Sequence, residues 1–118
     1  MTTSEIATVL AWHDALNARD GDTLVEISTG DIEIGDADGA VQGHDALREW
    51  AGSVESTVEP GRMFVHDGVV VVEQRVGDQS VASAFRVVHD KVASVYRHPD
   101  LAAALAATEL TEDDFVDG

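Results

Sequence analysis

The alternation of apolar and polar residues predicts a β-sheet in the second half of the chain. Valine, which favours extended backbone, is concentrated between positions 69 and 98. This part of the chain is predicted to form three successive strands, Val69–Val76, Ser80–His89 and Lys91–His98. The pairs Gly77-Asp78 and His89-Asp90 favour tight turns, so these strands should form an antiparallel meander.

Helical spacing replaces this alternation near the start of the chain. Apolar residues recur every three or four positions from about Ser4 to Ala18, which predicts an amphipathic helix with Ser4 as its N-cap. His13 lies near the middle of the apolar face, and Trp12 lies at its edge. The sequence Asp20-Gly21-Asp22 should end this helix and cap a second one over Thr23–Ser28.

A carboxylate interrupts the apolar face of the next predicted strand, Asp31–Asp36. Ile32 and Ile34 point to one side of this strand, and Asp36 falls on the same side because side chains alternate. Local conflicts of this kind are expected at functional sites. Asp36 is therefore the first candidate site residue.

The remaining segments complete an α+β pattern with an antiparallel sheet. We predict a loop over Ala37–Gln42, a helix over Gly43–Val54 and a strand over Thr57–His66 that bends at Pro60-Gly61. A last helix, with proline as its first residue, covers Pro99–Ala107, and a frayed acidic tail follows over Glu109–Gly118. Helices on one face of a curved sheet leave a conical hollow, which is a natural ligand pocket.

Composition limits the class of protein. At 118 residues the chain is predicted to be one domain, 1–118, with the acidic tail beginning at about residue 109. The absence of cysteine excludes disulfides, thiolate metal sites and cysteine nucleophiles. There is no apolar run of membrane-spanning length and no signal-like start, so we expect a cytoplasmic protein that does not bind membranes.

The charge balance is strongly acidic. Twenty-three acidic residues face seven basic ones, which gives a net charge of −16. Such a field repels phosphate backbones, so nucleic acid is not an expected partner. Solubility and adaptation to high salt both remain explanations for this charge.

Three segments carry a family resemblance: Trp12–Asp20, Gly43–Trp50 and Phe85–Leu101. In order and spacing, over roughly Ile6 to Ala107, they resemble the SnoaL-like polyketide cyclase branch of the nuclear transport factor two-like superfamily. The resemblance implies a cone-shaped α+β fold around an internal pocket, often in a homodimer. The superfamily includes ketosteroid isomerases, limonene epoxide hydrolases, scytalone dehydratases and members without known activity, so the fold does not choose the function.

The resemblance to ketosteroid isomerases is partial. Asp36 matches the position of their general-base aspartate, at the end of the first strand. Their oxyanion hole uses a tyrosine and an aspartic acid, and the resemblance places Trp12 and Ser83 at these positions. Trp12 can donate only through its indole N–H, and Ser83 is a weaker donor than a neutral carboxylic acid. Steroid-type enolisation would therefore lose a large electrostatic contribution.

The Asp–Arg–Asp arrangement of limonene epoxide hydrolases is absent. The positions of their Arg-x-Asp pair are occupied here by Gln74 and Val76. If the register is shifted by one residue, they are occupied by Arg75 and Gly77. Arg97 stands at the position of the second aspartate. Epoxide hydrolysis by that route is therefore not expected.

The resemblance also implies which polar side chains face the pocket. Gln74 and Ser83 would act as hydrogen-bond donors, and Arg97 would either neutralise Asp36 and clamp a ligand enolate or carboxylate, or pair with surface acids. Aromatic residues would form much of the wall, where core and ligand platform are the same surface: Trp12, Trp50 and Phe85.

Two catalytic candidates keep alternative interpretations. Asp36 is either a general base with a raised pKa in an apolar cavity or a solvated carboxylate that caps the following loop. His13 either pairs with Asp36 or a polar ligand group, or is a core histidine bonded to backbone or water.

Two functions follow from these observations. The first is a pocket for a small hydrophobic organic molecule, with Asp36 transferring a proton next to a carbonyl in an isomerase, cyclase or dehydratase reaction; it needs no organic cofactor and no metal. The second is a non-catalytic ligand-binding or dimerisation domain, whose interface would include Val71, Glu73 and Arg75 on the outer sheet face. The pocket volume between the first helix and the sheet distinguishes them.

Overall fold

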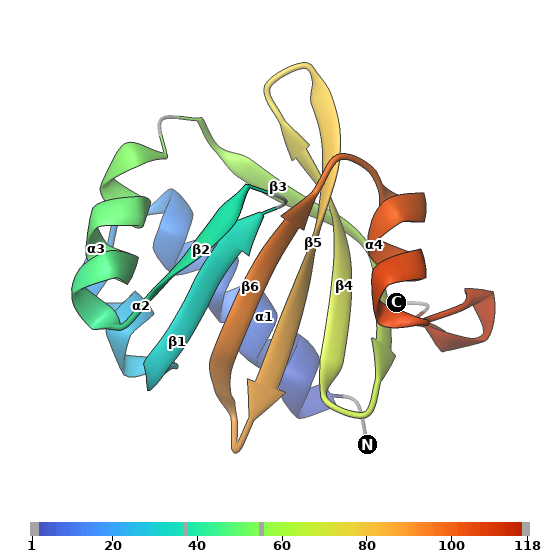
Figure 1. The fold of residues 1–118 in the computed structure, drawn as a ribbon, viewed down its shortest axis with the longest axis horizontal. Helices are drawn as coiled ribbons and strands as arrows, with labels where there is room; N and C mark the ends of the chain where they lie inside the picture. Colours follow the sequence, from blue (N-terminus) through green and yellow to red (C-terminus); the bar gives the residue numbers. More distant parts are fainter. Residues whose placement is uncertain (1–2, 37, 55, 117–118) are drawn as a thin grey trace.

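The computed structural model describes residues 3–36, 38–54 and 56–116, with side chains from Glu5 onward. They form an α+β fold in which a curved sheet lies between helices (Figure 1). In chain order the elements are α1 Thr3–Asn17, α2 Gly21–Glu26, β1 Ser28–Asp36, β2 Gly39–Gln42, α3 His44–Ser53, β3 Val58–His66, β4 Val69–Val76, β5 Gln79–Val88, β6 Lys91–His98, α4 Leu101–Thr108, the 3-10 turn η1 Glu112–Asp114 and β7 Phe115–Val116. Within the described residues the sheet order is β2-β1-β6-β5-β4-β3-β7.

The predicted meander is confirmed, since β3 to β6 pair in sequence as antiparallel neighbours. Positive φ angles at Gly77 and at His89-Asp90 form the predicted turns, because such backbone matches the twist of the flanking strands. The bend expected at Pro60-Gly61 is also present, as a register shift between Pro60 and Met63.

The strand β1 differs from the prediction in two ways. It pairs in parallel with β6, Gly35 lying opposite Tyr96, so the sheet is not antiparallel throughout. No hairpin links these two strands, which are far apart in the sequence, so a parallel pairing is allowed. The predicted loop after β1 contains the strand β2, with Gly39 opposite Asp36, while Ala37 lies outside the described residues.

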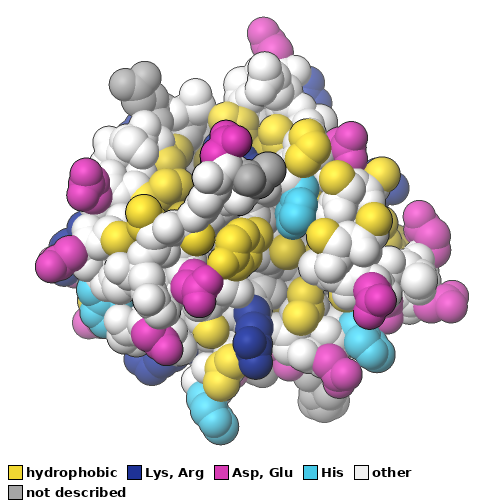
Figure 2. Space-filling view, viewed as in Figure 1, with side chains coloured by type: hydrophobic (Ala, Val, Ile, Leu, Met, Phe, Trp, Pro, Cys, Tyr) yellow, Lys and Arg dark blue, Asp and Glu magenta, His cyan; other side chains and the backbone are white. Residues whose placement is uncertain are grey.

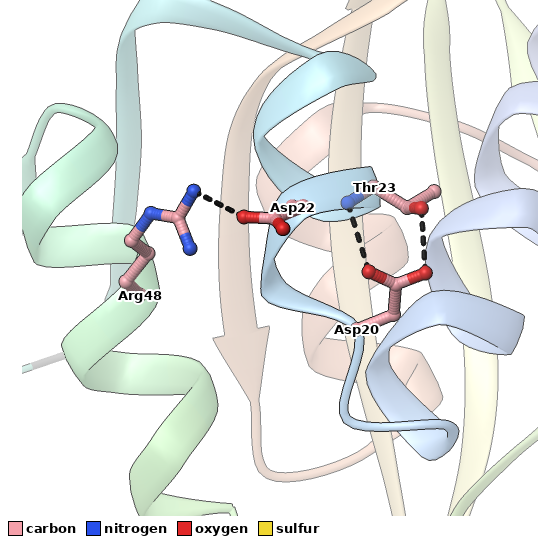
Figure 3. A network of polar contacts seen from close by, with 4 residues as sticks. All are labelled: Asp20, Asp22, Thr23 and Arg48. Atoms are coloured by element: carbon pink, nitrogen blue, oxygen red, sulfur yellow. Dashed lines mark hydrogen bonds and ion pairs between the residues drawn. The ribbon is translucent and has the colours of Figure 1, made fainter.

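Both ends of the first two helices shift slightly. Helix α1 begins at Thr3, so Ser4 lies inside it rather than at its N-cap. Helix α2 starts and ends two residues earlier than predicted. Its cap is Asp20, which accepts hydrogen bonds from the Thr23 backbone N–H at 3.2 Å and the Thr23 hydroxyl at 2.6 Å (Figure 3). These bonds lower the pKa of Asp20.

Helix α2 is joined to α3 by an ion pair. Asp22 in the first turn of α2 lies 2.7 Å from Arg48 of α3 (Figure 3). Both side chains are exposed, so the pair adds little to stability.

The last helix and the tail also differ from the prediction. Helix α4 is capped by Asp100, which accepts the Ala103 N–H at 2.8 Å, so Pro99 precedes the helix instead of opening it. The acidic tail is ordered up to residue 116, because β7 pairs with β3 and Phe115 packs on Phe64 at 5.4 Å. Residues 117 and 118 of the predicted tail lie outside the described part.

Helices cover the two sheet faces unequally. Helices α1, α2 and α3 pack on the inner face, where the main core forms. Helix α4 covers β4 and β5 on the outer face, and Figure 1 shows it on the opposite side of the sheet from α1. Of the three residues expected at an interface, Val71 is completely buried in the cluster that α4 covers, Glu73 is paired with Arg62 at 3.0 Å, and Arg75 is exposed.

Candidate functional site

A cavity of about 470 Å³ lies between the helices and the inner face of the sheet, below the β1–β2 hairpin. We call this cavity the inner pocket. It is lined by Trp12, Leu16, Ile34, Gly35, Asp36, Asp38, Gly39, Ala40, Val41, Trp50, Val58, Gln74, Ser83, Phe85, Val95 and Arg97. Its volume falls within the range of roughly 300–1,000 Å³ that small-molecule sites occupy.

Aromatic rings form one wall of the inner pocket. Trp12 lies 6.2 Å from Trp50 and 6.0 Å from Phe85, the second pair in an edge-to-face arrangement. Trp12 and Phe85 are almost fully buried, whereas Trp50 is half-buried. These rings belong to the core and to the pocket wall at once, as the sequence indicated.

Three buried polar side chains from separate elements form one hydrogen-bonded chain. We call His13 of α1, Gln74 of β4 and Ser83 of β5 the polar cluster. The His13 Nε2 atom lies 2.8 Å from Gln74 Nε2, and the Ser83 hydroxyl donates to Gln74 Oε1 at 2.7 Å. The other ring nitrogen of His13, Nδ1, lies 2.8 Å from the carbonyl of Val9. Register brings the cluster together, since Gln74 and Ser83 lie on neighbouring strands and face α1.

The surroundings of His13 favour its neutral form. Burial lowers its pKa below the ordinary value of 6.5, because the charged ring would lose hydration. The hydrogen bond to Val9 and the charge of Asp14 oppose this effect but do not outweigh it. His13 does not line the inner pocket; it lies behind Gln74 and contacts Phe85 at 5.5 Å between ring centroids.

Asp36 and Arg97 lie at the exposed end of the inner pocket. Asp36 Oδ1 accepts the backbone N–H of Asp38 at 2.8 Å, which is the capping role considered for this carboxylate. The structure does not bring Asp36 and His13 together, because both ring nitrogens of His13 are bonded elsewhere. Asp36, Gln74, Ser83 and Arg97 do share the pocket wall.

A second hollow, of about 390 Å³, lies on the outer face between β5, β6 and the end of α4. We call it the outer groove; Figure 2 shows hydrophobic side chains over the middle of this face and acidic ones around its edge. Tyr96 and His98 line the groove, and the Tyr96 hydroxyl donates to Glu33 at 2.6 Å, which raises the pKa of Tyr96. Thus Tyr96 faces outward and Arg97 faces Ser83, an orientation that the sequence pattern left open.

Sequence reasoning missed part of the pocket wall. The hairpin residues Gly39, Ala40 and Val41 line the inner pocket, although they were predicted to be a loop. Short strands with small residues give little periodic signal, so pairing with β1 is what reveals them.

Neither a metal site nor a membrane span is found in the described part of the chain. No group of three or more His, Asp or Glu side chains there is placed to hold a metal ion. No helix among the described residues is long and apolar enough to cross a membrane.

The chain resembles solved structures throughout its fold. A candidate polyketide cyclase from Sinorhizobium meliloti matches with a TM-score of 0.73 and 20% identity, over 78% of this chain and 94% of that one. A candidate ketosteroid isomerase from Kribbella flavida matches with a TM-score of 0.67 and 16% identity, over 80% and 76%. An NTF2-like protein of unknown function from Cytophaga hutchinsonii matches with a TM-score of 0.72 and 11% identity, over 86% of this chain and 94% of that one. These TM-scores show a common fold, and at identities this low they show the fold alone.

Sequence comparison identifies the family. None of the curated protein sequences matches the chain. The family model described as a SnoaL-like domain matches residues 9–102, which include α3, the meander and most of α1. The chain shares its NTF2-like fold with these solved structures, and it belongs to the SnoaL-like domain family.

Proposed function

We propose that the inner pocket binds a small, mainly apolar organic molecule with a carbonyl group, and that Asp36 transfers a proton beside this carbonyl. One observation carries the proposal: a carboxylate and a buried amide, those of Asp36 and Gln74, line the same aromatic-walled cavity of about 470 Å³. Apolar walls with a few placed polar groups are typical of sites that orient a small ligand.

The chemistry requires a base and a donor on the same pocket surface. The Asp36 carboxylate takes a proton from the carbon next to the carbonyl, the electron pair of that C–H bond forms a C=C bond, and the π pair of the carbonyl moves onto its oxygen. With Oδ1 held by Asp38, Oδ2 is the oxygen that accepts the proton. The Gln74 amide donates a hydrogen bond to the developing enolate oxygen, and the positive charge of Arg97 stabilises the negative charge on that oxygen further.

Returning the proton to a different carbon completes an isomerisation. In a cyclisation the enolate carbon attacks a second carbonyl, and the alkoxide that forms takes the proton back from Asp36. Loss of a hydroxide from the neighbouring carbon, taken up as water, completes a dehydration. Each of these reactions proceeds without a metal or an organic cofactor.

Hydrogen exchange tests the proton transfer without knowledge of the natural substrate. Aromatic ketones are incubated with the protein in D₂O, and the NMR signal of the protons next to the carbonyl is followed. We expect exchange with the wild type and at least a tenfold slower rate with Asp36→Asn. Asp31→Asn, an exposed acid on the same strand, is the matched control and should retain the rate. An equal rate for all three proteins would refute the role of Asp36.

Non-catalytic binding is the second candidate, and the exposure of Asp36 with its bond to Asp38 favours it. In that case ketones raise the melting temperature of the wild type and of Asp36→Asn equally, and no exchange occurs. The alternative of a dimerisation domain would place the contact at the outer groove, which the described helices leave partly open. Light scattering that shows a monomer at high concentration would remove this alternative.

A further inference from the structure

The polar cluster has a direction that follows from its atoms. A carbonyl oxygen only accepts, so the contact between Val9 and His13 requires the proton to be on Nδ1. The other ring nitrogen, Nε2, faces the amide nitrogen of Gln74, which only donates, so Nε2 carries a lone pair and no proton. Burial, which lowers the pKa of His13, favours the same neutral form. The Gln74 amide thus presents its nitrogen to His13 and its oxygen to Ser83.

This direction continues to the pocket surface. The Gln74 oxygen also only accepts, so the Ser83 hydroxyl proton is directed at it and not at the pocket. What remains for a ligand is the second N–H of Gln74, which no described residue accepts, and the lone pairs of Ser83. Gln74 and Ser83 both line the inner pocket, while His13 lies behind them.

We propose that His13 is a positioning residue that fixes the polarity of this wall, with one donor at Gln74 and one acceptor at Ser83, and so selects hydroxy ketones. The inference rests on the proposed function, because it assumes that ketones bind in the inner pocket. The ligand carbonyl accepts from Gln74, and a hydroxyl on the neighbouring carbon donates to Ser83. Ser83 thus acts as an acceptor, whereas the sequence suggested a donor.

Ketones that lack the neighbouring hydroxyl would leave the buried Ser83 oxygen without a partner. A diketone would place a second carbonyl oxygen against the Ser83 lone pairs, and an alkyl ether would place a methyl group there. Unpaired polar groups in a buried site reduce affinity strongly, which is how such sites reject analogues that lack a hydroxyl. We expect a preference of about tenfold, the effect of one such hydrogen bond.

The probes differ in a single group. The first is 2-hydroxy-1-(2-naphthyl)ethanone, the second is its O-methyl ether, and both are titrated by NMR. The wild type should bind the hydroxy ketone about tenfold more tightly than the ether. Ser83→Ala should bind both alike, because the acceptor is gone, whereas Ser83→Thr keeps the hydroxyl and should restore the preference. Ser80→Ala, an exposed serine on β5, is the control and should behave as the wild type.

The role of His13 is tested with His13→Gln. A glutamine side chain can either donate to or accept from Gln74, so it retains a polar partner without fixing the amide. The preference should fall to about twofold, while the affinity for the ether stays within a few-fold of the wild type. An unchanged preference in this variant would show that His13 only fills space.

The tautomer provides a readout without any ligand. Long-range ¹H–¹⁵N spectra should show His13 neutral, with its proton on Nδ1. A proton on Nε2 would overturn the inference, because the Gln74 amide would then be reversed. Equal affinities of the wild type for the two probes would overturn it while leaving the proposed function intact. If neither probe nor any simple ketone binds, the proposed function fails and the inferred ligand class fails with it.

Discussion

Replacing Gln74 by leucine should destabilise the protein through the two partners that it leaves behind. The substitution replaces the amide with an apolar side chain of similar size, and it leaves the His13 ring nitrogen and the Ser83 hydroxyl without a partner. These side chains are 1% and 3% exposed, so water reaches them poorly. A buried polar group without a partner costs about 1–3 kcal/mol, which gives a loss of about 3 kcal/mol for Gln74→Leu.

Ser83→Ala alone should cost less. It removes one hydrogen bond from the Gln74 oxygen, for about 1 kcal/mol. In the Ser83→Ala background, Gln74→Leu leaves one partner without a bond instead of two. The double variant should therefore lose about 2 kcal/mol, less than the sum of about 4 kcal/mol from the two single changes.

A double-mutant cycle measured by urea unfolding checks this coupling. Ser80→Ala replaces Ser83→Ala in the control cycle, because Ser80 lies on the same strand but is exposed and lies opposite Arg75, not Gln74. We expect coupling of at least about 1 kcal/mol in the first cycle and none in the second. Additive losses within about 0.5 kcal/mol in the first cycle would refute the hydrogen-bonded chain.

Three further predictions concern pH, packing and salt. The free energy of unfolding should fall as pH decreases below 6.5, because the unfolded chain takes up a proton on His13 before the folded protein does. In His13→Gln this free energy should depend less on pH. Urea unfolding at several pH values would contradict this if both proteins showed the same dependence on pH. Gly35→Ala should lose about 1–3 kcal/mol, since a Cβ there would lie 2.7 Å from the Ala40 Cβ, whereas Gly30→Ala meets nothing within 4 Å and should change little in the same assay. The melting temperature should rise steeply from low to molar KCl, because salt screens the repulsion expected at a net charge of −16, and a constant value would contradict this.

The sheet could be predicted because its signals are local. The strands β4, β5 and β6 are bounded by turns whose residues adopt positive φ. Their apolar runs are long enough to favour strand over loop. The strand β7 could not be predicted in this way. It is held by pairing with β3 and by the packing of Phe115 on Phe64, and both contacts join distant parts of the chain.

The candidate site was predicted as a set of residues but not as an arrangement. The strand pattern and the resemblance indicated Asp36, Gln74, Ser83 and Arg97, and all four line the inner pocket. The partner of His13 depends on the register of β4 against α1, which no local pattern encodes. The sequence therefore offered Asp36 as a partner, whereas the fold supplies Gln74.

The inner pocket separates its charged groups from its buried polar groups, and this separation explains the kind of ligand that we propose. Asp36 and Arg97 are exposed, so water can hydrate both side chains. Deeper in the wall, the polar cluster consists of neutral groups that satisfy one another. An anionic ligand would meet the repulsive field of a chain with a net charge of −16 before it reached Arg97. A neutral molecule does not meet this repulsion, and in the proposed reaction the carbonyl oxygen becomes negatively charged only when Asp36 takes the proton from the neighbouring carbon. The same wall can therefore admit a neutral ketone and stabilise the enolate that the carboxylate creates.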